Sequence, residues 1–497
     1  MKLPEFDEIH IVSDLHMGGM EGFQILRDTR RLAAFIDWVA EQRSKERVAL
    51  ILNGDIIDTL AEETGDYIAV ENACAVVQRI MEDKAFAPVW EALSKFVKTN
   101  GRTLIMAIGN HDLELSFPFV QRSIIEKLAG DDLKSRTRIE FSTIGGGYSC
   151  LVGNARVFCT HGNEVDPWNY NRYEDLSKLV RRRNCDRYLK PGEWEPNAGT
   201  KMVKDVMNKV KRQYPWIDLL KPEMKAAVGV LLALDPGQIE KIDQLIPIVG
   251  QKVVEQKQID KRLSADGFDV SLKEKSSFPN VDSLLGPNLT EGIRPSSANG
   301  IPTADAMLLT AEKEYKTGSA ATDPHNETLG SAGYVWDRVT GWFRGISKIE
   351  ALRRALKDWL KDDKTFDLTN RDDTCNDIVS TTGMGVNFIV TGHTHLERAI
   401  DLGNDRFYFN CGTWIRLLRF TEKMLENEDS FKPIFDVLDK GSMKTIDSTF
   451  FNGAPFVLDQ SSAICIGTKD GKTVGRLMHI EDDDAGVTPK LIQQFER

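Results

Sequence analysis

The chain lacks paired cysteines and long apolar segments. Its 7 cysteines are an odd number scattered over 497 residues without a Cys-x-x-Cys spacing. This argues against a disulfide scaffold or a thiolate zinc site and predicts reduced core thiols. The longest apolar run, AAVGVLLAL at 226–234, is far shorter than the ~20 residues of a membrane-spanning helix. The first residues lack the basic and apolar regions of a signal peptide, so we predict a soluble, cytoplasmic protein.

Positive charge is also in short supply. The chain has 64 Lys and Arg against 75 Asp and Glu, a formal net charge of −11, which argues against a generic nucleic-acid binder. Hydrophobic residues make up 41% of the chain, enough for a sizeable core and too many for a wholly disordered chain. The length suggests about three domains, or one large domain with insertions.

Apolar runs alternate with helical patterns over the first 165 residues. The runs at 8–14, 48–55 and 103–110 each end in polar residues, and helical patterns over 29–43 and about 71–98 separate them. This alternation predicts an α/β fold with a parallel or mixed sheet covered on both faces. Further strand patterns lie at 148–153, 155–162, 386–393, 406–412, 454–459, 462–467 and 473–480.

The middle of the chain has a different pattern. It is helical from about 173 to 263 and again over 336–363, and the stretch 265–330 is rich in Ser, Gly, Asn and Pro. We predict that this stretch is a long mobile loop. The sequence thus predicts a core in two parts, 1–165 and 381–497, interrupted by a mainly helical insertion at 166–380.

Five of the 8 histidines lie just past the end of an expected strand, beside Gly, Asp, Asn or Thr. An open α/β sheet builds its functional site at the carboxyl ends of its strands. One such segment alone is more often a turn than a site, but chance placement would not put five of them at strand ends. The segments are Asp14-Leu15-His16, Gly54-Asp55-Ile56-Ile57-Asp58, Gly109-Asn110-His111-Asp112, Thr160-His161-Gly162 and Gly392-His393-Thr394-His395.

Together these segments supply carboxylates, imidazoles and one amide, with no thiolate. That donor set suits two divalent cations. Mn²⁺ is the favoured metal, and Fe²⁺ and Zn²⁺ are the alternatives.

In this order the five segments resemble the motifs of the calcineurin-like metallophosphoesterases: D-x-H, G-D-x-x-D, G-N-H-[DE], an H-G step and G-H-x-H. The resemblance covers about 8–165 and 385–415 and implies a four-layer αββα sandwich. It also implies a hydrolase of phosphoric esters, in which a water activated by two metals attacks phosphorus.

The resemblance further implies a role for each residue. Asp14, His16 and His395 would bind one metal, and Asn110, His161 and His393 the other, with Asp55 bridging the two. His111 and Asp58 match the catalytic pair, in which the carboxylate keeps the imidazole charged and oriented for proton transfer.

Three departures from the family motifs narrow the range of expected activities. Thr59 and Leu60 stand where Ser/Thr protein phosphatases have Arg-Gly, which disfavours that activity. His111 stands where the enzymes that hydrolyse lipid A precursor pyrophosphates have Arg. Leu396 to Arg398 lack the proline that often follows the last motif.

The insertion leaves the core after His161 and returns before His393, so the sequence predicts a cap beside the metals. Its start, 172–212, holds 12 Lys and Arg against 6 Asp and Glu. Arg181, Arg182 and Arg183 are candidate substrate-binding residues, although a solvated helix face is an equal alternative. The run at 226–234 is a lipid-contacting lid or, more commonly, a buried helix.

Three functional hypotheses follow. The leading one is a phosphoesterase that hydrolyses a phosphodiester or phosphomonoester, with a phosphorylated small molecule or nucleotide as substrate. The alternative is a metal-dependent DNA or RNA nuclease of the same superfamily. The weakest is a non-catalytic scaffold, because all seven ligand positions are retained.

Overall fold

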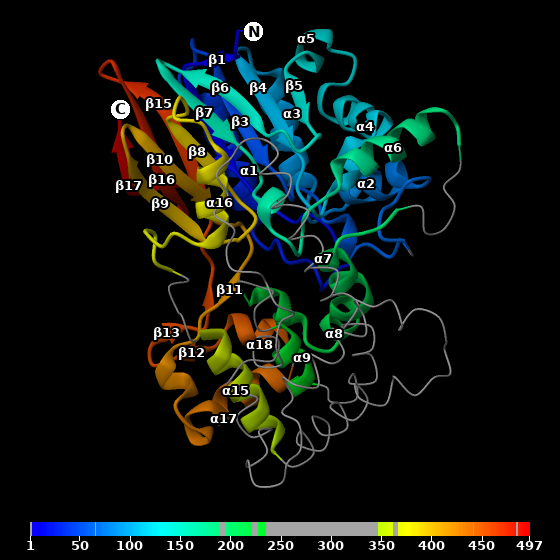
Figure 1. Ribbon diagram of the computed structural model, residues 1–497, viewed down its shortest axis with the longest axis vertical. Coiled ribbons are helices and arrows are strands. Elements are labelled where there is room, and N and C mark those ends of the chain that lie inside the picture. Colours follow the sequence, from blue (N-terminus) through cyan, green and yellow to red (C-terminus); the bar gives the residue numbers. More distant parts are fainter. Residues whose placement is uncertain are drawn as a thin grey trace, which may run out of the picture.

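The computed structural model describes residues 2–64, 66–187, 194–220, 227–234, 346–360, 366–440, 442–483 and 486–497. A strand-rich part containing both termini lies above a helical part in Figure 1. Two large sheets form the strand-rich part.

The first sheet has seven strands in the order β17-β16-β15-β2-β3-β4-β5. Neighbours from β2 to β5 are parallel, and β15, β16 and β17 continue the sheet in antiparallel pairs, so the predicted mixed sheet is confirmed. The strands are β2 (Glu8–Val12), β3 (Val48–Asn53), β4 (Arg102–Ala107), β5 (Ile139–Ser142), β15 (Ser462–Lys469), β16 (Lys472–Asp483) and β17 (Gly486–Glu496).

The second sheet has six strands in the order β1-β6-β7-β8-β10-β9. β8 pairs in parallel with both β7 and β10. Its pairing with β7 joins two strands that are more than 200 residues apart in the sequence. The strands are β1 (Glu5–Phe6), β6 (Tyr148–Val152), β7 (Ala155–Cys159), β8 (Phe388–Thr391), β9 (Glu397–Gly403) and β10 (Arg406–Cys411).

The central strands of each sheet are buried on both faces. On β3, Ala49 and Ile51 join an apolar cluster between the sheets, while Leu50 and Leu52 face the helices of the outer layer, as the two-residue period of a strand requires. That outer layer consists of α1 (Thr29–Glu41), α2 (Ala73–Glu82), α3 (Ala87–Lys98), α4 (Pro118–Ala129) and α6 (Tyr173–Asn184).

The outer face of the second sheet is covered in the same way. Ile389 and Tyr408 pack there against Cys375 and Ile378 of α16 (Asp373–Thr381). The order of layers is therefore helix, sheet, sheet, helix, which confirms the αββα sandwich.

The sequence prediction differed from the structure in a few elements. The expected long helix over 71–98 is two helices, because Asp83 caps the end of α2 and accepts a hydrogen bond from the Ala85 N–H at 2.9 Å. Pro88 then lies in the first turn of α3, where its missing N–H costs nothing. Of the strands in the two large sheets, β1, β5, β9 and β17 were not predicted, and neither were the short strands at Leu417–Leu418 and Phe450–Phe451.

A second apolar cluster holds the helical part together. We call the elements around it the helical layer: α7 (Ala198–Lys201), a π-helical turn at Met202–Met207, α8 (Asn208–Lys211), α9 (Ala227–Leu234), α15 (Lys348–Leu360), α17 (Glu428–Asp439) and α18 (Met443–Asp447). Leu418 and Val457, from the short paired strands β11 (Leu417–Leu418) and β14 (Val457–Leu458), belong to the same cluster. Residues 417–457 thus pack with the helical layer, although the sequence assigned them to the second part of the core.

The run at 226–234 contributes to this cluster. Val230, Ala233 and Leu234 of α9 are buried in this cluster, and α9 packs against α15, which favours the buried-helix interpretation over a lipid-contacting lid. The stretch 265–330, expected to be mobile, and the first part of the helix expected at 336–363 lie outside the described residues.

All seven cysteines are free thiols, as expected, and five of them are buried. Among the described residues, no helix combines the length and the apolar character that crossing a membrane requires.

His10 in β2 forms a buried ion pair that makes stability depend on pH. Its Nε2 lies 2.9 Å from Glu8 Oε1, and Arg43 Nε lies 2.9 Å from Glu8 Oε2. Burial opposes protonation of His10, but its contacts with Cys465 and Glu8 raise its pKa to about 9. Because this exceeds the ordinary value of 6.5, the stabilisation is fully present below pH 6.5 and is lost as pH rises through 9.

We therefore expect wild-type protein to lose on the order of 3 kcal/mol of unfolding free energy relative to His10→Gln between pH 6 and pH 9.5. Denaturant unfolding of both proteins at each pH measures the difference. Glu8→Gln should reduce the same pH dependence only in part, because Cys465 also raises the His10 pKa, whereas a difference independent of pH would refute the charged histidine.

Candidate metal centre

The five sequence segments come together at one end of the sandwich. Asp14 and His16 follow β2, Asp55 and Asp58 follow β3, and Asn110 and His111 follow β4, all in the first sheet. His161 follows β7, and His393 and His395 follow β8, both in the second sheet. Because these five strands run in parallel within each sheet, their carboxyl ends meet at a shared edge.

The backbone at this edge adopts unusual conformations. Asp14, His16, Asp55, His393 and His395 all have positive φ, between 48° and 70°. Residues other than glycine reach this region at a steric cost that persists where the surrounding structure imposes it. These backbone conformations turn the polar side chains at the strand ends toward the same point.

Glycines let the segments approach one another. A Cβ on Gly109 would overlap the Asp55 carboxylate, and one on Gly392 would overlap the side chains of Ser13 and Asp14. The Gly-Asn-His and Gly-His-x-His motifs therefore need glycine at their first position.

The first group of potential ligands contains Asp14, His16 and His395, all of them buried. His395 Nε2 lies 3.2 Å from Asp14 Oδ1 and 3.2 Å from His16 Nε2. Asp14 is held in place because its carboxylate accepts hydrogen bonds from the Ser13 hydroxyl and from the His393 N–H.

The second group contains Asp55, His161 and His393. His161 Nδ1 donates to the backbone carbonyl of Asn53 at 2.9 Å, which directs Nε2 toward Asp55 Oδ2 at 3.1 Å. Burial disfavours a charge on His161, but the Asp55 carboxylate outweighs this effect and raises the His161 pKa to about 10.

Asp55 lies between the two groups. Its Oδ2 is 3.8 Å from His16 Nε2 in addition to its contact with His161, and its Oδ1 accepts the His111 N–H at 2.8 Å. Burial raises its pKa, but the surrounding imidazoles, His161 foremost, bring it far below the usual range. Asp55 is therefore a charged carboxylate that contacts an imidazole of each group.

His111 and Asp58 form a pair beside these groups. His111 Nδ1 lies 3.0 Å from Asp58 Oδ1, and the His111 ring lies edge-on to the His16 ring with their centroids 4.7 Å apart. Despite complete burial, contact with His111 and then His16 keeps the Asp58 pKa well below its usual value.

The sequence analysis missed several residues that support the site. Asp166 Oδ2 accepts a hydrogen bond from His393 Nε2 at 2.8 Å, and Asp166 itself is fixed by the Trp168 N–H and the Asn169 amide. Its only sequence signal is a carboxylate five residues after His161. Thr413 donates its hydroxyl hydrogen to the Asp14 backbone carbonyl at 3.0 Å, and no sequence pattern indicates this contact.

Arg181, Arg182 and Arg183 lie in the last turn of α6, on the helical face of the core beside α2 and α4 (Figure 1). The Arg183 guanidinium lies 5.2 Å from the Phe119 ring centroid and 3.6 Å from Glu71. Their predicted contact with substrate stays a prediction.

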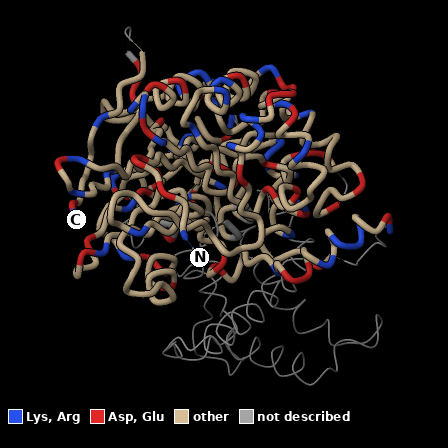
Figure 2. The backbone as a smooth tube through the Cα atoms, turned by 90° about the horizontal axis from the view of Figure 1, so that it is seen from above, with Lys and Arg blue, Asp and Glu red and all other residues tan. Residues whose placement is uncertain are grey.

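The surroundings of these arginines are not uniformly basic. Within the basic stretch 172–212, Lys178, Lys201, Lys211 and Arg212 each form an ion pair with an acidic residue. Figure 2 shows both signs of charge interspersed over the described chain in that view.

The donor atoms fit divalent cations. Asn110 Oδ1 is buried and has no hydrogen-bond partner in the described structure, an arrangement that costs free energy unless a cation or water satisfies the oxygen. Within each group, the donor atoms lie within 4.8 Å of one another. Imidazole, carboxylate and amide donors together suit Mn²⁺, Fe²⁺ or Zn²⁺.

Comparison with known families agrees with this geometry. Residues 8–216 match the model of the calcineurin-like phosphoesterase family. The last motif lies beyond the matched range, but β8 places it against the other four in the same sandwich. No curated protein matches the chain. Residues 8–216 therefore carry a domain of the calcineurin-like phosphoesterases, a family of hydrolases that act on phosphoric esters and typically use two metal ions.

Proposed function

We propose that the protein is a metal-dependent phosphoesterase that hydrolyses a small phosphodiester or phosphomonoester. Asp14, His16 and His395 would hold one divalent cation. Asn110, His161 and His393 would hold the second, and Asp55 would bind both. The observation that carries the proposal is the position of Asp55, which lies within 3.8 Å of an imidazole from each group.

When bound, the two cations would supply the positive charge that neutralises the phosphoryl oxygens and lowers the pKa of a water nucleophile. The protein supplies the positions. Asp166 fixes the orientation of the His393 ring and leaves Nδ1 as its ligand atom, and the Asn53 carbonyl does the same for Nε2 of His161. Such supporting hydrogen bonds hold a ligand in one tautomer and one orientation.

His111 would act as the general acid. The Asp58 carboxylate at 3.0 Å favours the charged imidazole and orients it. A protonated His111 can donate its Nε2 hydrogen to the oxygen of the departing alcohol, so that the leaving group is neutral when the P–O bond breaks.

We also propose that the insertion at 166–380 acts as a cap that governs substrate choice through its part in the helical layer, whereas α6 and α16 of the same range cover the core sheets. A cleft of about 370 Å³ separates the core loops at 18–25 and 58–67 from the helical layer at 204–218, and Asp58 lies in its wall. Tyr67 and Lys204 bridge the two sides through hydrogen bonds to Asp205 and Thr64. A cap there can orient a substrate without contributing a metal ligand.

A metal and substrate panel tests the proposed function. Purified protein is expected to bind about two divalent ions per chain, and Mn²⁺ is expected to restore activity after chelation. The substrates are bis-p-nitrophenyl phosphate, p-nitrophenyl phosphate, cyclic nucleotides, and single- and double-stranded DNA.

Hydrolysis that is insensitive to EDTA, or one tightly held zinc per chain, would contradict the proposal. Efficient cleavage of DNA with an affinity that falls steeply with salt would replace it by the nuclease alternative.

A further inference from the structure

A small pocket opens beside the first group of ligands. It has a volume of about 200 Å³, and His395 and Thr413 lie in its wall. These are the residues that contact Asp14 through its carboxylate and its backbone carbonyl. The pocket therefore shares His395 with the first group of ligands, and it has no wall residue in common with the cleft beside Asp58.

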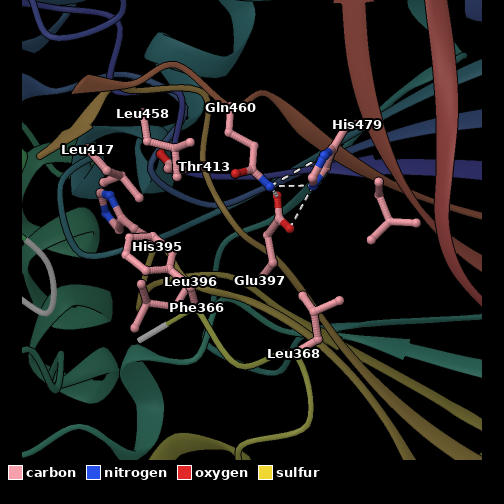
Figure 3. A pocket seen from close by; sticks show the side chains of 11 residues that line it. Phe366, Leu368, His395, Leu396, Glu397, Thr413, Leu417, Leu458, Gln460 and His479 are labelled. Atoms are coloured by element: carbon pink, nitrogen blue, oxygen red, sulfur yellow. Dashed lines mark hydrogen bonds and ion pairs between the residues drawn. The ribbon is translucent and has the colours of Figure 1, made fainter. Parts of the chain in front are cut away.

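The pocket forms where three parts of the fold meet. Leu396 directly precedes the edge strand β9 of the second sheet, and Leu368 lies in a turn whose carbonyl accepts a hydrogen bond from Ala399 of β9. Ile492 comes from β17 of the first sheet, and Leu417 and Leu458 come from the short strands of the helical layer. In Figure 3, Leu396, Leu417 and Leu458 lie on the side of His395, and Leu368 lies beyond Glu397. With Phe366, these side chains make six of the eleven residues of the wall apolar.

The polar side chains of the wall bind one another. Glu397 accepts hydrogen bonds from His479 Nε2 and from the Gln460 amide, each at 2.8 Å, and the three form one cluster at the far end of the pocket in Figure 3. Because these groups form their hydrogen bonds within the wall, a ligand gains mainly by burying apolar surface.

The size of the pocket limits its ligand. A cavity of about 150 Å³ lined by aliphatic side chains holds one benzene ring, so about 200 Å³ accepts one ring or a short branched alkyl group. A nucleotide base with its sugar does not fit.

The relative positions of His111, His16 and His395 indicate which part of a substrate enters the pocket. The His16 ring lies between the other two, with its centroid 4.7 Å from that of His111 and 4.9 Å from that of His395. If His111 protonates the departing oxygen, the side of phosphorus away from His111 faces His395, and an ester group that stays on phosphorus can extend to that side.

From these observations we infer that the protein is selective for phosphodiesters with one small apolar ester group, and that the pocket beside His395 binds this retained group. The inference rests on the proposed function. Hydrolysis adds water across one P–O bond, releases the leaving alcohol and yields the monoester of the apolar group.

Two diesters with the same leaving group test the inference: phenyl p-nitrophenyl phosphate and methyl p-nitrophenyl phosphate. Each releases p-nitrophenolate and leaves phenyl or methyl phosphate. In the Mn²⁺-loaded full chain, kcat/KM is expected to be at least about tenfold higher for the phenyl diester, because burying a ring is worth a factor of that order.

Variants locate the selectivity. Leu458→Gln makes the half-buried wall polar, and Ile492→Trp fills the pocket, so each is expected to reduce the phenyl-to-methyl ratio toward one. Leu402→Gln is the matched control, because Leu402 is also half-buried and lies on β9 but packs on the outer face of the second sheet. It should keep the wild-type ratio.

The outcomes separate the inference from the proposed function. Hydrolysis of both diesters at equal kcat/KM, or a high ratio that survives in both pocket variants, overturns the pocket and leaves the phosphoesterase intact. If neither diester is hydrolysed, the proposed function fails for diesters. Calorimetric titration with phenylphosphonate and methylphosphonate then tests whether the pocket binds an apolar group. Tighter phenylphosphonate binding that Leu458→Gln abolishes supports the pocket, and equal binding of the two overturns it.

Discussion

Replacing Asp55 by alanine is expected to reduce the bound metal from about two ions to at most one per chain and to lower turnover at least ~10³-fold. Asp55 is the side chain that faces both ligand groups, with His161 Nε2 at 3.1 Å and His16 Nε2 at 3.8 Å. Its loss removes a donor from each group and leaves their imidazoles without the buried negative charge that balances them. Metal analysis of the purified variant and its Mn²⁺-dependent kinetics measure both effects.

Two further variants test whether the loss of metal in Asp55→Ala reflects only a loss of folding. Asp55→Asn keeps an oxygen that can accept the His111 N–H but lacks the charge, and it should fold yet bind metal weakly. Glu114→Gln removes another buried carboxylate, one that contacts Thr59 and the Ala69 N–H outside both ligand groups, and it should retain two metals. Full metal content in Asp55→Ala would show that the bridging assignment is wrong.

The second large effect is expected at His111. His111→Ala should keep both metals but lose ~10²–10⁴-fold in kcat on esters of alkyl alcohols, which need a proton to leave. Esters of p-nitrophenol should lose much less, because p-nitrophenolate is a good leaving group without protonation. The measurement is the ratio of the two rates, together with the metal content of the same sample.

Asp58→Asn is the companion variant. The amide keeps the shape of the carboxylate that lies 3.0 Å from His111 Nδ1 but no longer favours the charged imidazole. We expect a smaller loss with the same dependence on the leaving group. An empty metal site in His111→Ala, together with full activity in Asp58→Asn, would make His111 a ligand instead of an acid.

Much of the core was predictable because its signals are local. An apolar run that ends in polar residues reports a buried strand, as at 48–55, and regular apolar spacing reports α1 at 29–41. The edge strand β17 was not predicted, because its residues are exposed or half-buried and therefore form no apolar run.

The donor residues were also readable from sequence. Each segment carries its glycine and its polar residues within about five positions, and parallel strands bring their carboxyl ends together whatever their order in the sheet. The sequence could therefore nominate Asp14, Asp55, Asn110 and the histidines without knowing any distance.

Supporting contacts depended on the folded chain. The sequence alone determined the two-part α/β core and the residue types at its strand ends, because both follow from short-range patterns. Only the tertiary structure decided that Asp166 orients His393, that 417–457 pack with the helical layer and that three separate elements enclose a pocket beside His395. The physical reason is that such contacts join side chains from distant or differently patterned segments. Their meeting depends on strand order and packing, which no local periodicity records.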